Sequence, residues 1–87
     1  MLIYSKGNVV TVYIDEIQNL VEKTSNLIYT LPEEQIPMHK CYVDTVSTDL
    51  SEFYRFTIST DGTIRCYPYQ GVSKQSTVAV SINFIRN

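Results

Sequence analysis

The segment from Phe53 to Tyr69 constrains the fold more than any other part of this sequence. Two runs rich in β-branched and aromatic residues flank Asp61-Gly62, a pair that is typical of hairpin turns. A two-residue loop at this pair would place Ile58 opposite Arg65 and mix apolar and charged side chains on both faces. Because a slip of one residue turns every side chain to the other face, the pattern decides between turn lengths.

A three-residue loop, Thr60-Asp61-Gly62 with Gly62 in the left-handed conformation, separates the two faces cleanly. It pairs Ser59 with Thr63. One face of the hairpin then carries only apolar side chains: Tyr54, Phe56, Ile58, Ile64, Cys66 and Pro68. The other face carries Phe53, Arg55, Thr57, Arg65, Tyr67 and Tyr69. The proline predicts that its strand lies at a sheet edge or ends nearby.

Further strands are expected from β-branched and alternating runs at residues 2–4, 9–14, 26–30, 38–46 and 77–85. Residues 15–23 predict either a short helical turn or a long loop, because the apolar positions around them have helical spacing. Prolines bracket residues 31–37, which predicts an extended bridge at a sheet edge. Residues 47–52 and 70–76 are polar loops. The sequence thus predicts one all-β domain, residues 1–87, folded as a small antiparallel β-sandwich or jelly roll.

The composition excludes several classes of function. Charged residues make up 18% of the chain, the net charge is −2 and the pI is about 5.2. A nucleic-acid module would show a basic stripe, and the seven Lys and Arg residues form none. No apolar run approaches the ~18 residues that a membrane helix needs. The N-terminal residues also lack the apolar core of a signal peptide.

A chain of 87 residues buries little surface by itself, so oligomerisation is expected to supply the missing core.

Two interpretations of Cys41 and Cys66 stay open: they form a disulfide or, more simply, they are separate buried thiols. No metal site is expected, because ligands at close spacing are lacking. His39 and Cys41 would share a strand face as a nucleophile pair, but such pairs are common by chance.

Four carboxylates are candidates for acid–base chemistry: Asp44, Asp49, Glu52 and Asp61. Asp61 has a simpler role as a turn former, and the others are expected in solvated loops. The sequence therefore predicts no catalytic residue and no cofactor.

The aromatic and basic side of the hairpin is the remaining candidate for function. Its members are Phe53, Arg55, Arg65, Tyr67 and Tyr69. In the preferred register Arg55 lies opposite Tyr67, so that the two can stack. Three interpretations stay open: a contact with another subunit, the core of a second layer, or a platform on which sugar rings stack.

Four segments in their order along the chain resemble the C-terminal receptor-binding head domain of tail-fibre and baseplate proteins from phages of Gram-positive bacteria. They are the opening strand at 6–12, the Leu-Pro bridge at 31–37, the hairpin at 58–64 and the closing strand at 78–85. The bridge departs from the family pattern, with Glu34 in place of a usual Gly and Ile36 where Arg is common.

This resemblance implies a small β-sandwich that acts as a homotrimer at the tip of a virion tail. It also implies binding to cell-wall polysaccharide or other surface glycan of a host, with no catalytic residue. Family heads follow a long fibre shaft, whereas Met1 stands almost at the first expected strand. A second expectation is therefore an assembly module that trimerises or caps a longer fibre chain without binding sugar.

Overall fold

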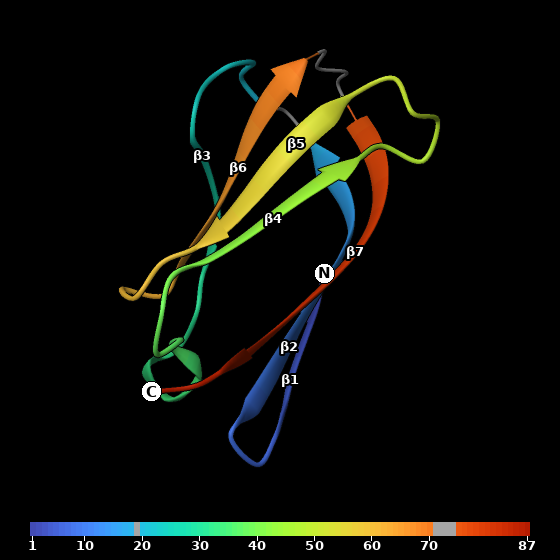
Figure 1. The fold of residues 1–87 in the computed structure, drawn as a ribbon. Coiled ribbons are helices and arrows are strands. Elements are labelled where there is room, and N and C mark those ends of the chain that lie inside the picture. Colours follow the sequence, from blue (N-terminus) through green and yellow to red (C-terminus); the bar gives the residue numbers. More distant parts are fainter. Residues whose placement is uncertain (19, 71–74) are drawn as a thin grey trace.

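A computed structural model describes residues 1–18, 20–70 and 75–87, and its seven strands form an all-β fold (Figure 1). The strands are β1 (Leu2–Lys6), β2 (Val9–Gln18), β3 (Asn26–Thr30), β4 (Cys41–Val46), β5 (Phe53–Ile58), β6 (Thr63–Gln70) and β7 (Gln75–Ile85). One 3-10 turn, η1 (Glu33–Gln35), precedes β4. The predicted all-β class is thus confirmed.

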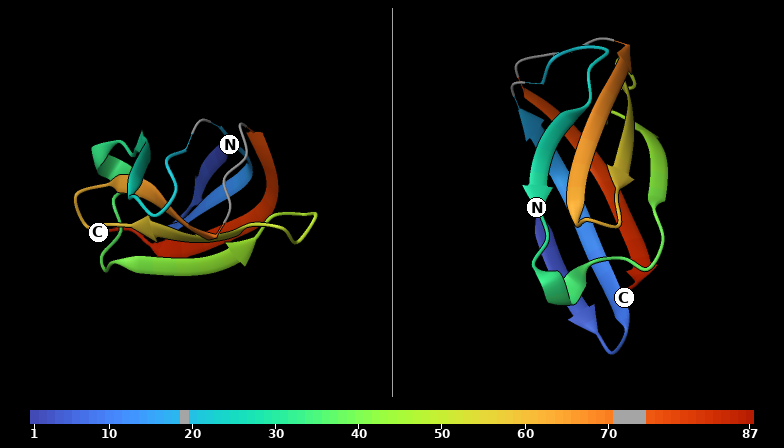
Figure 2. Two further views of the ribbon diagram at one scale, coloured as in Figure 1. Left: turned by 90° about the horizontal axis from the view of Figure 1, so that it is seen from above. Right: turned by 90° about the vertical axis from the view of Figure 1, so that its left-hand side faces the viewer.

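The strands form two antiparallel sheets, which Figure 2 shows as two layers. The three-stranded sheet has the order β1-β2-β7, and the four-stranded sheet has the order β3-β6-β5-β4. Strands far apart in the chain therefore lie side by side, since β2 pairs with β7 along most of its length. This arrangement is the small β-sandwich that the sequence predicts.

The inner faces of the two sheets supply the core. From the three-stranded sheet come Val10, Val12, Ile14, Ile17, Val78, Val80, Ile82 and Phe84. From the four-stranded sheet come Tyr54, Phe56, Ile58, Ile64 and Cys66, joined by Leu31 from the bridge. The alternation predicted for the hairpin and for the closing strand is confirmed, because these side chains are all buried.

The β5–β6 hairpin has the predicted register. Ile58 pairs with Ile64, and Arg55 with Tyr67. The Gly62 N–H donates to the Ser59 carbonyl at 2.9 Å, and Gly62 has a φ of +89°. The three-residue loop with a left-handed glycine is therefore confirmed.

Residues 15–23 do not form the expected helical turn or long loop throughout, because β2 continues to Gln18. Ile14 and Ile17 are both buried although they are three residues apart. The pairing of β2 with β7 shifts register between Ile14 and Glu16, so the two-residue alternation breaks at this point. An irregular strand here produces the same apolar spacing as a helix.

The bridge at 31–37 is not extended throughout, because Glu33–Gln35 form the 3-10 turn. The residues on either side of the turn are extended. Pro37 then forms an isolated antiparallel bridge with Arg86 just beyond β7. The location of the bridge beside a sheet edge is as predicted, but its middle is a turn. The strand expected at 38–46 begins only at Cys41.

Pro68 does not lie at a sheet edge, because β6 is an inner strand of the four-stranded sheet, but the predicted alternative of a nearby strand end holds. β3 pairs with β6 only as far as Cys66. The Pro68 carbonyl accepts a hydrogen bond from the Lys23 N–H at 2.9 Å, outside the β3–β6 ladder. Pro68 is thus accommodated where β3 no longer accompanies β6, two residues before β6 ends at Gln70.

The polar loop expected at 70–76 falls partly outside the described residues, which omit 71–74. At its two ends Gln70 belongs to β6 and Gln75 begins β7. The loop at 47–52 is present as predicted, and its two ends are bonded by the Ser47 N–H donating to the Glu52 carbonyl at 2.9 Å.

Candidate functional site

The outer face of the four-stranded sheet carries the aromatic and basic side chains that the sequence singles out. Phe53 and Tyr69 are 42% and 40% exposed, and Arg55, Arg65 and Tyr67 are half-buried. This exposure excludes a second core layer formed by the described part of the chain. The outer face is therefore available to a ligand or to another subunit.

Arg55 is fixed at the middle of this face by a carboxylate from the neighbouring strand. Asp44 of β4 lies directly opposite Arg55 of β5 in the register. The Arg55 Nε donates to Asp44 Oδ1 at 2.8 Å, and Nη2 donates to Oδ2 at 3.0 Å. This two-bond fork raises the pKa of Arg55 and lowers the pKa of Asp44 below its ordinary value. Both groups therefore stay ionised.

Two tyrosine rings also hold the guanidinium. Arg55 Cζ lies 5.4 Å from the ring centroid of Tyr42 and 5.7 Å from that of Tyr69. Both distances are within the ~6 Å range of cation–π attraction. The arginine thus contacts rings on β4 and β6, in addition to facing Tyr67 across the ladder as predicted.

Tyr67 and Tyr69 complete an open depression beside Arg55. Their ring centroids are 5.4 Å apart in an edge-to-face arrangement. The depression has a volume of about 360 Å³ and is lined by Ser25, Arg55, Thr57, Tyr67 and Tyr69. It combines aromatic surface with hydroxyl groups and one guanidinium, which is a mixture suited to a small polar ligand.

The structure brings together three of the five predicted site residues: Arg55, Tyr67 and Tyr69. Phe53 and Arg65 share the outer face but do not line the depression. Arg65 lies toward the hairpin tip, where hydrogen bonds from Thr63 and, to a smaller extent, the charge of Arg65 lower the pKa of Asp61.

Sequence reasoning missed Tyr42, Asp44 and Ser25 as members of this site. Asp44 was grouped with the carboxylates of solvated loops, although it falls within the strand expected at 38–46, and it lies within β4. Tyr42 and Asp44 are two residues apart and so share a strand face. Pairing that strand with β5 would have placed both beside Arg55, but the sequence does not fix which strands are neighbours.

The possible nucleophile pair does not assemble. The Cys41 thiol donates to the backbone carbonyl of His39 at 3.3 Å, and partial burial raises the pKa of this thiol. Cys66 is buried in the core, where desolvation raises its pKa to about 12. Both cysteines are free, so no disulfide is formed, and their raised pKa values disfavour the reactive thiolate.

The remaining carboxylates have structural roles. Asp49 accepts hydrogen bonds from the hydroxyls of Ser47 and Ser51, at 2.6 and 2.7 Å, which lower its pKa to about 2. Asp61 accepts the Thr63 N–H and hydroxyl at the hairpin turn, as predicted. Glu52 lies buried at the end of the loop at 47–52 rather than in solvent.

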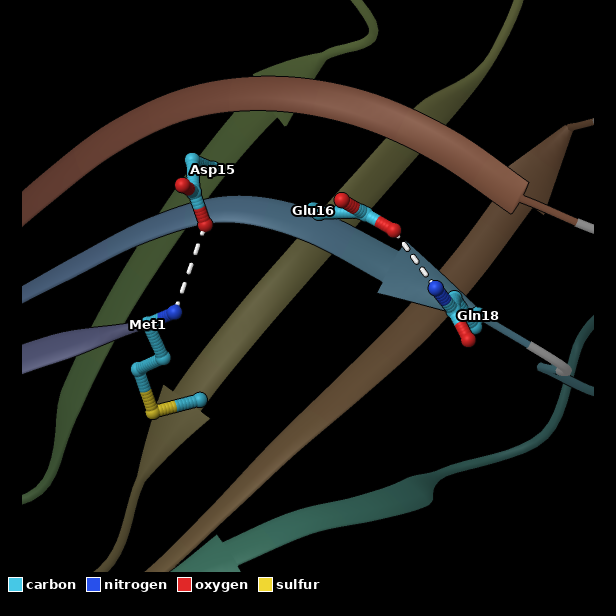
Figure 3. A network of polar contacts seen from close by, with 4 residues as sticks. All are labelled: Met1, Asp15, Glu16 and Gln18. Atoms are coloured by element: carbon cyan, nitrogen blue, oxygen red, sulfur yellow. Dashed lines mark hydrogen bonds and ion pairs between the residues drawn. The ribbon is translucent and has the colours of Figure 1, made fainter.

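A second depression of about 510 Å³ opens between β2 and β3, lined by residues that include Ile17, Leu27 and Ile28. Its polar groups contact one another (Figure 3). The Met1 amine lies 3.3 Å from the Asp15 carboxylate, and the Gln18 amide donates to Glu16. This depression lacks the paired aromatic rings and arginine of the first, so it is the weaker candidate site.

No family model matches the chain, and no curated protein proves similar to it. Within the described residues, no group of His, Cys, Asp and Glu side chains is arranged to hold a metal ion. The same residues include no helix with the length and apolarity to cross a membrane.

Proposed function

We propose that this chain is the receptor-binding head of a phage or phage-like tail. In this role it is a non-enzymatic homotrimer at the virion tail tip that attaches to a host cell-surface glycan. The observation that carries the proposal is the depression where Tyr67 and Tyr69 meet the Arg55–Asp44 fork. The resemblance of four segments to such heads supports the same function.

The depression offers each kind of contact that a sugar ring uses. Aromatic faces carry negative charge density and attract the sugar C–H groups that point outward from the ring. The hydroxyls of Ser25 and Thr57 can donate and accept hydrogen bonds. The guanidinium of Arg55 donates only, and Asp44 and two rings hold it in one position. A polar ligand would thus meet donors that need little reordering.

Attachment by this depression would depend on repetition. A single open depression of this size supports weak binding. Three copies in a trimer, and several trimers on one particle, would raise the effective affinity without any new contact. The trimer would also bury apolar surface that one short chain leaves exposed.

The test is binding of the purified chain to wall polysaccharide from a Gram-positive bacterium. Tyr69→Ala should weaken binding at least about tenfold, because an aromatic contact is worth roughly 1–1.5 kcal/mol and acts in every subunit. Tyr29→Ala is the matched control, since Tyr29 of β3 is similarly exposed, at 45%, and lines neither depression. Equal losses in the two variants, or no binding of the parent chain, would contradict the proposal.

The outer face of the three-stranded sheet favours a second candidate function, an assembly module that trimerises or caps a fibre. Five large apolar or aromatic side chains are exposed there: Leu2, Tyr4, Val9, Tyr13 and Ile85. Aromatic residues are enriched at subunit contacts. An assembly module would show the trimer by light scattering but no binding of wall polysaccharide, and the Tyr69→Ala variant would then have no binding to lose.

A further inference from the structure

The charged groups that the structure places at the aromatic depression are an arginine and its paired carboxylate. Among the described residues that line the depression, Arg55 is the one that carries a charge. Its partner Asp44 accepts two of its hydrogen bonds, so the pair has no net charge. Arg65 lies outside the depression. Lys40 lies over the outer ring of Tyr42, 5.3 Å from its centroid, and does not line the depression.

The fork leaves Arg55 able to bind a ligand but not as a free positive charge. A guanidinium has five N–H groups. Two of them point at Asp44, which leaves three for other acceptors. A phosphate or carboxylate that approached those groups would also meet the negative charge of Asp44. A neutral hydroxyl would accept the same hydrogen bonds without that repulsion.

We infer that the ligand of this depression is an uncharged sugar, stacked on Tyr67 and Tyr69 and hydrogen-bonded to Arg55 while Arg55 stays paired with Asp44. The inference rests on the proposed function, in which the depression binds glycan, and it specifies the class of glycan. It predicts binding that depends little on salt, since no net charge is neutralised. An anionic ligand would instead bind more weakly as salt rises.

The experiment is a two-dimensional NMR titration of the ¹⁵N-labelled chain with small probes. The neutral probes are methyl glucoside, methyl galactoside and methyl rhamnoside, and the anionic probes are glycerol 3-phosphate and glucuronate. At least one neutral probe should shift the amides of Thr57, Tyr67 and Tyr69 and the Arg55 Nε resonance. Its affinity should change by less than about twofold between roughly 0.02 and 0.5 M NaCl.

The two possible failures are distinguishable. If the anionic probes shift these resonances more strongly than the neutral probes do, and salt weakens the anionic binding, the site binds glycan but the inference is wrong. If no probe of either kind shifts them, the proposed function of the depression fails together with the inference. Shifts confined to the second depression, at Ile17 and Ile28, would also overturn both.

Asp44→Asn tests directly whether Asp44 causes the preference for uncharged ligands, because the variant removes the compensating charge and leaves a side chain of the same shape. The variant should bind glycerol 3-phosphate at least about tenfold more tightly than the parent, and salt should abolish the gain. Glu33→Gln, which changes an exposed carboxylate of η1 that lines neither depression, is the matched control and should gain nothing. The NMR spectrum shows whether the Asp44→Asn variant is folded. If the folded variant gains no anion binding, Asp44 does not determine which ligand charge the site accepts, and the inference is wrong. The salt profile of the parent chain is an independent test if the variant does not fold.

Discussion

The β1–β2 and β5–β6 hairpins use the same turn chemistry in opposite environments. Each has a glycine with positive φ, +62° at Gly7 and +89° at Gly62. A Cβ built on Gly7 would have no neighbour within 4 Å. A Cβ on Gly62 would lie 3.1 Å from Ile36 Cγ1 and 3.2 Å from the Leu31 carbonyl oxygen. The bridge therefore packs over the Gly62 turn, whereas the space beside the Gly7 Cα is open, although Arg86 donates to the backbone carbonyls of Gly7 and Asn8.

The outer faces of the two hairpins also differ. The β1–β2 hairpin exposes Tyr4 and Tyr13 among aliphatic side chains, and the described residues show no arginine on that face. The β5–β6 hairpin exposes rings beside the Arg55–Asp44 fork. This difference underlies the two proposals, self-contact through one sheet and ligand contact through the other.

The largest difference between the hairpins is expected in the free energy of unfolding that is lost when the core beneath each of them is truncated. Phe56→Ala should reduce the free energy of unfolding by about 4 kcal/mol, because it opens a large cavity at a fully buried position. Val12→Ala, equally buried on the opposite sheet, removes far less volume and should cost about 2 kcal/mol. Urea denaturation of both variants measures the two costs. A larger loss for Val12→Ala would place the best-packed region under the β1–β2 hairpin instead.

Substitution of the two turn glycines should give the next largest difference in stability loss between the hairpins. Gly62→Ala combines the strain of a left-handed residue with a clash against the bridge, so its expected cost is about 3 kcal/mol. Gly7→Ala has only the backbone strain, with an expected cost of about 1 kcal/mol. Thermal or urea unfolding gives both values. Equal losses would show that the bridge does not press on the β5–β6 turn.

The β5–β6 hairpin was predictable because one physical argument fixes it. Only the three-residue loop keeps its apolar side chains on one face, and that face is buried. The strand from 77 to 85 was predictable for the same reason. By contrast, the break in alternation at Asp15–Glu16 has the apolar spacing of a helix, so β2 was cut short in the prediction.

The candidate site was predictable only where it lies within one hairpin. Arg55, Tyr67 and Tyr69 follow from the β5–β6 register. Tyr42 and Asp44 come from β4, and their position beside Arg55 depends on which strand pairs with β5 and in what register. Those choices are decided by packing of the whole sandwich, not by the local pattern.

Self-association should depend on the β1–β2 face and not on the β5–β6 face. Replacing Tyr4 and Tyr13 together by Ser should weaken self-association by about 2 kcal/mol, roughly 30-fold, because aromatic residues dominate subunit contacts. The matched double replacement of Tyr67 and Tyr69 by Ser should leave it unchanged. Sedimentation equilibrium measures both. If only the second pair matters, the β5–β6 face is the subunit contact and the glycan proposal loses its surface.

The smallest expected difference is in how the two turns respond to acid. Asp61 accepts the Thr63 N–H at 3.0 Å and the Thr63 hydroxyl at 2.7 Å, and these bonds lower its pKa below the ordinary 3.8. A lowered folded-state pKa means that the stabilisation is complete above the unfolded value and is lost as the pH falls through the folded value. The Thr63 amide should therefore exchange faster with solvent as the pH drops below about 3.8, after correction for intrinsic exchange. The Gly7 turn, which has no carboxylate, should show no such change, and Asp61→Asn should abolish the response at Thr63. A Thr63 amide whose protection stays constant down to pH about 2 would show that the carboxylate does not hold this turn.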